Sequence, residues 1–362
     1  MSDNPISVGI VGFGRSGCGI HADAIALQPG RFRIAAVCDP LPERQADARK
    51  LGATAYAGID ELLRDPAVEL VIVASPNRFH AGHARQALDA GRHVLCEKPF
   101  GFTVADVDAM ISAAQRAGRV LQPFQQRRFE PDFNEVRRVI RSGVLGTVTR
   151  MRICLHGFSR RWDWQTDRGW GGGQLYNNGP HPLDHALELF GDAEPLVACE
   201  LRRSLCSGAA EDEVAITLSA PGHPTIQIEL LATAAYAQDK WWVCGTAGGL
   251  RSNGNRLEWR WVDWSRMPAR PLDLRPTPDR SYNGEKLEWQ ESSWQPTAAG
   301  DGGAGAPPAK QPTLDLYASL WDAVRLGRPQ VITPASVRRR VAVLERCYRL
   351  SGIAFPEGAL GA

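Results

Sequence analysis

The sequence lacks the features that mark disulfide-stabilised, zinc-stabilised and membrane-spanning proteins. Its 362 residues include eight cysteines, but none forms a Cys-x-x-Cys pair and their spacing is irregular. This pattern argues against a disulfide framework and against a structural metal site. No apolar run is long enough to span a bilayer, and Met1–Pro5 shows no basic-then-apolar signal pattern. We therefore expect a cytoplasmic protein with no metal and no membrane partner.

The sequence also lacks an excess of charge of either sign. It has 42 Lys and Arg residues against 40 Asp and Glu residues, which gives a net charge of +2. This balance provides no field that would attract nucleic acid, so we expect no nucleic-acid partner. What is present is an ordinary globular composition, 43% hydrophobic and 23% charged, and a length sufficient for two domains.

Residues 1–125 alternate short apolar runs with helical patterns, which indicates a parallel sheet built from βαβ units. Leu70–Ala74 is apolar throughout, as expected of a strand that helices cover on both faces. The pattern predicts an α/β Rossmann domain with a doubly wound parallel sheet over residues 1–125. Strands are expected at 7–11, 34–38, 54–56, 70–74, 93–96 and 120–123, and helices at 18–27, 42–51, 80–90 and 103–117.

After residue 125 the pattern changes to segments that alternate apolar and polar residues with period two. This alternation is typical of an antiparallel sheet with one exposed face. We predict an α+β domain over residues 126–362 with a large, mostly antiparallel open sheet. Residues 268–312 are rich in Pro and Gly and are expected to form a long excursion, partly disordered near 297–308. Strands are expected at 147–155, 214–218, 226–230, 241–243 and 257–261, and helices at 133–142, 313–326 and from Pro334 onwards.

A glycine-rich loop follows the first predicted strand and precedes a helix. In such a loop the glycines permit a tight turn and a close approach of the backbone to a pyrophosphate, which the helix N-terminus attracts. Asp39 ends the next strand 22 residues later, where its carboxylate is able to bind the adenosine ribose. The pattern predicts a nicotinamide dinucleotide site; the alternative is a glycine turn that binds no ligand. The loop residues are Gly12, Phe13, Gly14, Arg15, Ser16 and Gly17.

Asp39 also bears on the choice between the two nicotinamide cofactors. A carboxylate at this position repels a 2′-phosphate, so the sequence favours NAD over NADP. Arg15 in the loop and Arg44 in the following helix keep NADP open, because either guanidinium is able to reach a phosphate. For Arg44, a solvated helix position is the simpler alternative.

Three further blocks carry a family resemblance. They are Leu95–Gly101 (LCEKPFG) with Ser75, Asn77 and His80 upstream, Gly171–Asp184, and Cys244–Leu250. In this order they resemble the Gfo/Idh/MocA family of sugar and inositol oxidoreductases over nearly the whole chain. The resemblance implies an NAD(P)-dependent dehydrogenase that acts on a secondary alcohol of a sugar, inositol or related polyol. It also implies an active site between the two domains, and a homodimer or homotetramer formed through the second-domain sheet.

The resemblance assigns roles to individual residues. Lys98 matches the family's active-site lysine, whose ammonium favours loss of a proton from the substrate oxygen, and it is also expected to contact the cofactor. His181 matches the catalytic histidine, which accepts the hydroxyl proton while hydride leaves the same carbon. Glu97 is expected to hold the nicotinamide half or to orient Lys98. Further positions that match the cofactor site are Ser75, Asn77 and His80, with a capping or core role as an equal alternative for His80.

The chain departs from the commonest family pattern at Asn177. Many relatives carry an aspartate four residues before the histidine, and at that spacing two side chains share one helical face if the segment is helical. An aspartate would raise the pKa of the imidazole, whereas asparagine is able to fix the ring by a hydrogen bond but adds no charge. Asp184 is the candidate compensating carboxylate; its alternative is an ordinary acid in a helix.

Three residues are candidates for substrate binding. Trp164 and Asp163 combine an aromatic face with a carboxylate, which suits sugar recognition, and Arg128 follows the last Rossmann strand. The alternative for the tryptophans is core or oligomer contact, because the chain has 11 of them. Two other functions remain open: a redox-neutral NAD-dependent glycosidase or epimerase, and a non-catalytic dinucleotide-binding regulatory protein, against which Lys98 and His181 argue.

Overall fold

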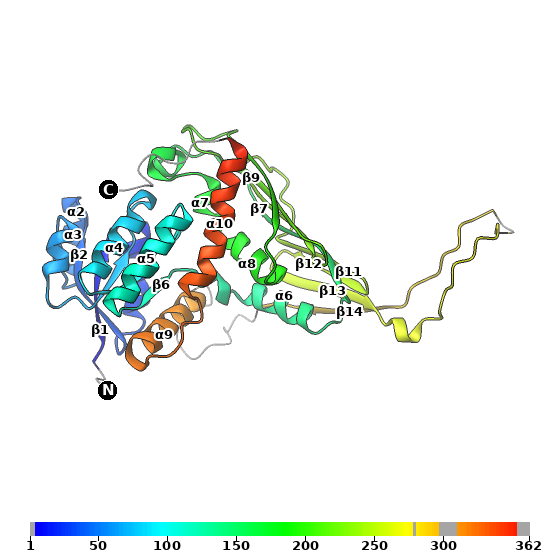
Figure 1. Ribbon diagram of the computed structural model, residues 1–362, viewed down its shortest axis with the longest axis horizontal. Helices are drawn as coiled ribbons and strands as arrows, with labels where there is room; N and C mark the ends of the chain where they lie inside the picture. Colours follow the sequence, from blue (N-terminus) through cyan, green and yellow to red (C-terminus); the bar gives the residue numbers. More distant parts are fainter. Residues whose placement is uncertain (1–3, 278–279, 297–309, 353–362) are drawn as a thin grey trace.

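The first sheet has six parallel strands in the order β3-β2-β1-β4-β5-β6 (Figure 1). The computed structural model describes residues 4–277, 280–296 and 310–352. The order reverses between β1 and β4, which is the switch point where doubly wound folds bind ligands. The predicted doubly wound domain is confirmed. Its strands are β1 Ile6–Val11, β2 Phe32–Cys38, β3 Thr54–Tyr56, β4 Leu70–Val73, β5 His93–Cys96 and β6 Leu121–Pro123.

Helices cover both faces of this sheet, and their ends follow local signals. The Thr103 hydroxyl caps α5 by accepting a hydrogen bond from the Asp106 amide, and Gly118 ends the helix with a φ of 61°. The helix expected at 18–27 is divided into a π-helical turn, η1, and the short helix α1. The helical elements are η1 Gly17–Ala22, α1 Asp23–Ala26, α2 Pro42–Lys50, α3 Ile59–Arg64, η2 Asn77–Phe79, α4 His80–Asp89, α5 Val104–Ala117 and η3 Gln126–Phe129.

The second sheet has eight strands in the order β14-β13-β12-β11-β7-β10-β9-β8. All neighbours are antiparallel except β7 and β10, which run parallel. Strands β9 and β10 alternate buried and half-buried residues, as the period-two pattern predicts. The strands are β7 Val148–His156, β8 Leu196–Arg202, β9 Glu213–Ser219, β10 Thr225–Leu231, β11 Trp241–Gly245, β12 Gly248–Asn253, β13 Arg256–Val262 and β14 Trp289–Trp294.

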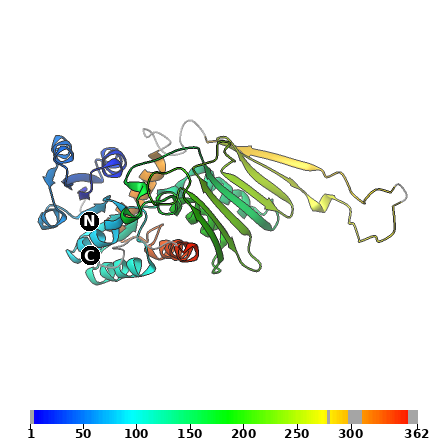
Figure 2. The same ribbon diagram turned by 90° about the horizontal axis from the view of Figure 1, so that it is seen from above.

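Helices cover one face of the second sheet and leave the other open (Figures 1 and 2). Helices α6 (Pro131–Arg141) and α8 (Pro180–Phe190) pack on the side toward the first domain, where Phe133 and Leu183 join the strand residues in one core. The opposite face carries polar and aromatic side chains, and Trp242 on β11 is 43% exposed. The prediction of a mostly antiparallel open sheet is confirmed.

The segment expected as an irregular excursion, 268–312, contains a strand. Residues 289–294 form β14, the edge strand, which pairs with β13 so that Trp289 lies opposite Val262. Strand β14 carries little apolar alternation of its own, so its pairing with β13 rather than its sequence pattern defines it. Before it, residues 263–277 and 280–288 extend away from the body as an arm (Figure 1), and the disorder expected near 297–308 falls outside the described residues.

The C-terminal helices connect the two cores. Helix α9 (Gln311–Leu326) returns to the first domain, where Leu316 and Tyr317 join the Rossmann core. Helix α10 (Pro334–Ser351) places Val341 in the first core and Leu344 in the second. The division at residue 125 therefore separates the two sheets, while both C-terminal helices pack against the first domain. Within the described part of the chain, no helix has the length and apolarity that crossing a membrane requires.

Truncating Leu344 should destabilise the fold. Its side chain is fully buried in the second core, so Leu344→Ala should lower the free energy of unfolding by about 2–5 kcal/mol, because it removes apolar contacts and leaves a cavity. Chemical denaturation monitored by tryptophan fluorescence measures the change. Arg346→Ala, an exposed position on the same helix, is the control and should change the stability little. Equal effects of the two substitutions would contradict the connecting role of α10.

Candidate active site

The glycine loop lies between β1 and η1, and its glycines have different roles. A Cβ on Gly12, where φ is 90°, would lie 2.6 Å from the Ala74 carbonyl oxygen, and a Cβ on Gly17 would lie 2.0 Å from the Gly12 oxygen. Both glycines are therefore required by the packing of the chain itself. A Cβ on Gly14 would meet only the Arg44 guanidinium, at 3.5 Å. The backbone at Gly14 is thus open to the approach of a phosphate, which fits a dinucleotide.

Asp39 lies at the end of β2 beside this loop, as predicted. Its carboxylate is buried and accepts hydrogen bonds from the Phe13 amide (2.8 Å) and the Leu41 amide (3.0 Å). The Arg44 guanidinium lies 3.2 Å from the same carboxylate, and its side chain is 44% exposed, so Arg44 is a solvated helix residue that also pairs with Asp39. This pairing offsets part of the repulsion that Asp39 would exert on a 2′-phosphate. Arg15 is exposed and Ser16 is half-buried in the loop.

The residues after β4 connect the first domain to the second. His80 is buried, and its two ring nitrogens lie 2.9 Å from the Pro99 oxygen and 2.7 Å from the Ser75 oxygen. The ring thus joins two loops at the sheet edge, which is the core role considered as its alternative. The Asn77 amide donates to the Gly171 oxygen (2.8 Å) and to the Asn177 side-chain oxygen (3.1 Å) in the second domain.

Lys98 crosses between the domains from the end of β5. Its ammonium donates a 2.7 Å hydrogen bond to the backbone oxygen of Asn177. Burial lowers the pKa of Lys98, the charges of Arg127 and Arg15 lower it further, and the carboxylate of Glu97 opposes this change. Lys98 is therefore a mostly buried hydrogen-bond donor at the contact between the two domains.

His181 lies in the first turn of α8 and is 4% exposed. Burial holds the pKa of this imidazole well below its usual range, and the positive charges of Arg127 and Lys98 add to the effect. The Nδ1 atom is buried and has no hydrogen-bond partner among the described residues. A buried, neutral ring with one unsatisfied nitrogen is suited to exchange a proton with a bound molecule.

The segment from Asn177 to His181 is not one helix, so the condition for a shared helical face is not met. Asn177 ends helix α7 (Gln174–Asn177), and α8 begins at Pro180, so the two residues do not share one continuous helix. The Asn177 amide donates to the Gln165 backbone oxygen (3.1 Å), and its oxygen accepts from Asn77. Asn177 therefore fixes the contact between the domains and not the imidazole ring.

Asp184 and Arg128 contact each other. The Arg128 guanidinium donates to the two oxygens of Asp184 at 2.7 and 2.8 Å, and the buried Arg340 lies 3.4 Å away. Asp184 is thus shared by two arginines, which fits the structural alternative for this residue, and the compensating role of Asp184 and the substrate role of Arg128 stay predictions. Burial lowers the pKa of Arg340 to about 10, opposed by the charge of Asp184. The cluster holds α8 and α10 together.

The sequence prediction selected Arg128 from the Arg-Arg pair and did not select Arg127. In η3 the two neighbouring side chains have different partners, Glu130 for Arg127 and Asp184 for Arg128. The charge of Arg127 acts on both Lys98 and His181. The Arg127 backbone oxygen lies 2.8 Å from Nε2 of His185, one helical turn after His181. The signal for this residue was present in the Gln-Gln-Arg-Arg run, but the sequence alone does not fix which arginine faces the site.

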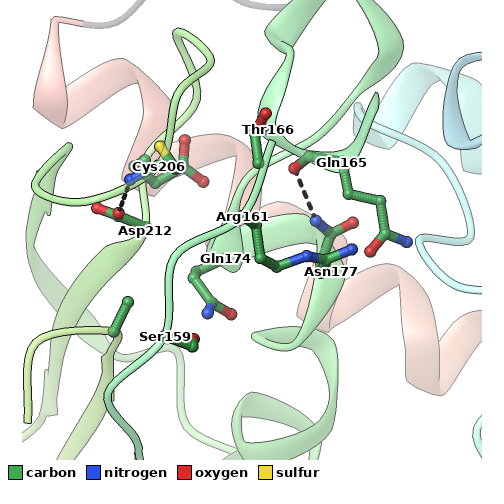
Figure 3. Close-up of a pocket in the computed structure, with 10 residues that line it drawn as sticks. Ser159, Arg161, Gln165, Thr166, Gln174, Asn177, Cys206 and Asp212 are labelled. Atoms are coloured by element: carbon green, nitrogen blue, oxygen red, sulfur yellow. Dashed lines mark hydrogen bonds between the residues drawn. The ribbon is translucent and has the colours of Figure 1, made fainter. Parts of the chain in front are cut away.

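Asp163 and Trp164 border a small polar pocket (Figure 3) without lining it. Asp163 accepts from the Gln165 amide at 2.9 Å and pairs with the Arg161 guanidinium at 2.7 Å, while Trp164 is 39% exposed. The free space of the pocket is about 20 Å³, which holds a water molecule but no sugar ring. The substrate role of Asp163 and Trp164 thus stays a prediction.

Glu211 lines the same pocket and is a residue that sequence reasoning missed. Its carboxylate accepts hydrogen bonds from the Leu175 amide and the Tyr348 hydroxyl, both at 3.1 Å, and burial raises its pKa to about 7. A Cβ on Gly173 would lie 2.2 Å from a Glu211 oxygen, so this carboxylate explains one glycine of the Gly171–Gly173 triplet. No sequence spacing indicates this contact.

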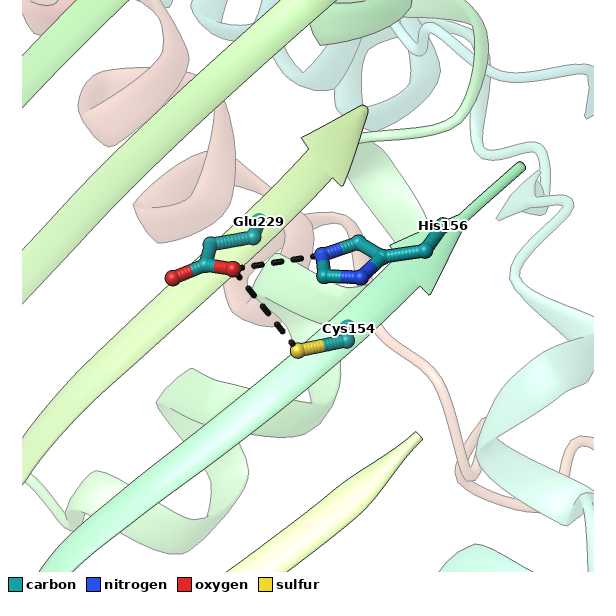
Figure 4. Close-up of side chains that lie close together, drawn as sticks. All are labelled: Cys154, His156 and Glu229. Atoms are coloured by element: carbon teal, nitrogen blue, oxygen red, sulfur yellow. Dashed lines mark hydrogen bonds and ion pairs between the residues drawn. The ribbon is translucent and has the colours of Figure 1, made fainter. Parts of the chain in front are cut away.

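Cys154, His156 and Glu229 form a cluster of potential metal ligands on the open face of the second sheet (Figure 4). The Gln238 amide donates to Nδ1 of His156 at 3.1 Å, so the ring proton lies on Nε2, which is 3.2 Å from the Glu229 carboxylate. A metal on Nε2 would leave a proton on Nδ1 facing the Gln238 N–H. Burial also raises the pKa of the Cys154 thiol to about 12. Hydrogen bonds therefore account for the arrangement of these three side chains, and a metal is not needed to explain it.

Replacing Asp184 should affect stability more than proton transfer. Asp184→Asn removes the charge that two buried or nearly buried arginines share, so the free energy of unfolding should fall by about 3–5 kcal/mol in denaturant titrations. The Glu188→Gln variant, which removes the more exposed carboxylate that Arg128 also contacts, is the control and should change it far less. A variant as stable as the wild type, with a shifted pH–activity profile, would instead support the compensating role.

Two family models match the chain. The model described as oxidoreductase family, NAD-binding Rossmann fold, matches residues 6–125, and that of the Gfo/Idh/MocA C-terminal domain matches residues 133–251. D-glucoside 3-dehydrogenase of Escherichia coli is 35% identical over 53% of this chain and 56% of its own length. The NADP-dependent scyllo-inositol 2-dehydrogenase of Bacillus subtilis is 28% identical over 53% of this chain and 54% of its own length. The chain thus matches little more than half the length of these curated relatives.

The fold extends over nearly the whole chain in solved structures. The WlbA dehydrogenase of Bordetella pertussis, solved with NADH and UDP-GlcNAcA, has a TM-score of 0.76 and 21% identity, and the match covers 97% of each chain. The two family models together cover the first sheet and the second sheet as far as β12, and the glycine loop, Lys98 and His181 lie within them. The chain therefore belongs to the Gfo/Idh/MocA family of oxidoreductases with an NAD-binding Rossmann fold.

Proposed function

We propose that this protein is a dehydrogenase that uses NAD to oxidise a secondary alcohol of a sugar, inositol or related polyol. The observation that carries the proposal is the pairing of a buried ammonium with a buried, unsatisfied imidazole. Lys98 and His181 lie at the contact between the domains, close enough for the charge of Lys98 to act on the ring. Both residues match the family positions for catalysis, and the inositol and glucoside dehydrogenases named above support the substrate class.

Different residues would bind the cofactor, stabilise the developing charge and accept the proton. Gly12–Gly17 and Asp39 would hold the dinucleotide, which when bound supplies the acceptor for the hydride. The Lys98 ammonium donates a hydrogen bond to the substrate oxygen and stabilises the negative charge that develops when the proton leaves. His181 accepts that proton, because its low pKa keeps the ring neutral at physiological pH. No carboxylate pairs with the resulting imidazolium at position 177, since Asn177 is neutral and turned away.

A redox-neutral reaction is the second candidate, and the missing carboxylate at position 177 is the observation that favours it. An imidazolium without a partner releases its proton readily, which suits a cycle in which the hydride is returned to the substrate. The two candidate functions differ in whether NADH accumulates. Accumulation of NADH in proportion to substrate supports the dehydrogenase, whereas product formed with catalytic NAD and no net NADH supports the redox-neutral enzyme.

Replacing either catalytic candidate should remove turnover and preserve cofactor binding. Lys98→Met and His181→Ala should each lower kcat by about 10²-fold or more, because each removes a group that acts on the reacting oxygen. Turnover is measured as reduction of NAD and NADP with a panel of free sugars, inositols and methyl glycosides. Cofactor affinity, measured by intrinsic fluorescence, should remain within about twofold for the preferred cofactor.

Lys50→Met, at an exposed lysine of α2 that pairs with Asp47, is the matched control and should keep full activity. Wild-type turnover that survives either substitution would contradict the assigned role of that residue. A wild-type protein that reduces neither cofactor and converts no compound of the panel would contradict the proposed function and favour a regulatory protein that binds the dinucleotide.

We further propose that the open face of the second sheet binds a second copy of this chain. A groove of about 870 Å³ lies over β11–β14, and its lining includes Trp242, Trp264 and Trp289. The arm, whose ribbon extends from the same sheet in Figure 2, leaves Leu272 and Tyr282 at least 85% exposed. Exposed tryptophans that lie among charged side chains such as Arg251 and Glu258 on one face support an interface between copies.

A charge on this face should therefore disrupt the assembly. Trp242→Arg should reduce the mass in solution to that of a single chain, because the guanidinium cannot be desolvated in an apolar interface. Light scattering coupled to gel filtration measures the mass. Leu41→Arg, at a similarly exposed apolar residue of the first domain, should leave the mass of the assembly unchanged. A wild-type protein with the mass of one chain would contradict the proposal.

A further inference from the structure

A chain of buried polar groups leads from helix α9 to the residue before Lys98. The Tyr317 hydroxyl lies 2.8 Å from Nδ1 of His21, and Nε2 of His21 lies 3.3 Å from the Glu97 carboxylate. The other oxygen of Glu97 accepts a 3.0 Å hydrogen bond from the Lys98 amide. Tyr317 and His21 are fully buried and Glu97 is 4% exposed. The chain of contacts ends at the proposed catalytic lysine.

The surroundings of the His21, Tyr317 and Glu97 side chains are apolar. The His21 ring packs against Phe124 at 4.6 Å between ring centres, and the Tyr317 ring packs edge-on against Phe32 at 5.2 Å. A polar group buried without a partner in such surroundings costs free energy, so the three side chains are stable there only together. Apolar residues of similar size would fill the same space without this requirement. Packing alone therefore does not explain why these three buried side chains are polar.

The contacts fix where one proton lies. In a neutral ring that accepts the Tyr317 O–H at Nδ1, the ring proton is on Nε2, whose 3.3 Å contact with Glu97 is electrostatic rather than an aligned hydrogen bond. In a charged ring that donates from Nδ1 to the Tyr317 oxygen, a proton is again on Nε2. The remaining form, with only Nδ1 protonated, would place a lone pair against the carboxylate. The Glu97 carboxylate disfavours that form, and the Tyr317 hydroxyl, which is able to donate to Nδ1, supports the neutral form that carries its proton on Nε2.

We propose that His21 and Tyr317 are positioning residues that keep Glu97 ionised and oriented next to Lys98, so that Lys98 retains its ammonium proton during the reaction. This inference rests on the proposed function, in which the Lys98 ammonium acts on the substrate oxygen. Neither residue touches the substrate in this account. Both act through Glu97, which is bonded to Lys98 along the backbone and by the amide contact.

The charges in the site support the direction of this effect. Burial alone would raise the pKa of Glu97, but the contact with His21 and the charge of Lys98 outweigh it and hold the pKa below its usual range. Burial lowers the pKa of Lys98, and Glu97 is the carboxylate that opposes this effect. Loss of the Nε2 proton donor should therefore raise the pKa of Glu97 and, as Glu97 becomes neutral, lower the pKa of Lys98.

Four variants separate this role from packing. His21→Phe removes both ring nitrogens and keeps an aromatic ring, whereas His21→Gln keeps an N–H donor for Glu97. Tyr317→Phe removes only the hydroxyl. Phe124→Leu is the matched control, because it changes the packing around His21 without removing a polar atom.

The first readout is the alkaline limb of the pH profile of kcat/KM, which reports the deprotonation of Lys98 in the free enzyme. The second needs no activity. The chain has only five lysines, at positions 50, 98, 240, 286 and 310, so the ¹³Cε signal of Lys98 is assigned by its loss in Lys98→Met and titrated directly.

His21→Phe should move both the alkaline limb and the Lys98 titration down by about one pH unit, the size of effect expected from losing one nearby charge. Tyr317→Phe should move them less in the same direction. His21→Gln should keep both close to their wild-type positions, and Phe124→Leu should leave them unchanged. Variants that lose kcat or stability with an unmoved Lys98 titration would overturn the proposal and leave a packing role. If the variants show the expected shift by NMR but the wild-type protein turns over no substrate, the result would contradict the proposed function alone.

Discussion

The hydrogen bond from the Lys98 ammonium to the Asn177 backbone oxygen is the contact on which the site depends. It joins the carboxyl edge of the parallel sheet to the short helix before α8, and so it brings a lysine of one domain to the histidine of the other. Asn77 strengthens the same contact by donating to Gly171 and to Asn177. The two domains thus meet through polar groups at the proposed catalytic lysine and at Asn177. A ligand that engages Lys98 must therefore act on the contact between the domains.

Burial sets the protonation states at this contact. It lowers the pKa values of both Lys98 and His181, and nearby positive charges add to the effect, so the site contains a histidine that is neutral and a lysine whose charge needs support. Glu97 supplies that support from within the first domain, backed by His21 and Tyr317. The charge of Asp184 is shared by Arg128 and Arg340. The two carboxylates near the site therefore have separate tasks, one electrostatic and one structural.

The features that follow from local rules were predictable from the sequence. The glycine loop and Asp39 are placed by a strand, a turn and a helix that are adjacent in the chain, so their spacing is enough to predict them. Contacts between distant segments were not predictable. Asp184 binds Arg340, which is 156 residues away, and His21 binds Tyr317, which is 296 residues away. Strand β14 was missed because its partner β13 defines it, and Asn177 and His181 do not share a helical face because the helix between them is interrupted.

The most direct test of the account is whether hydrogen leaves a ring carbon of the substrate for the cofactor. The measurement uses the polyol or sugar with the highest turnover in the cofactor-reduction screen, deuterated at its ring carbons, with unlabelled NAD. The account predicts that mass spectrometry finds one deuterium in the reduced cofactor, and that this transfer is lost in Lys98→Met and His181→Ala. A reduced cofactor without deuterium, or transfer that persists in both variants, would contradict it.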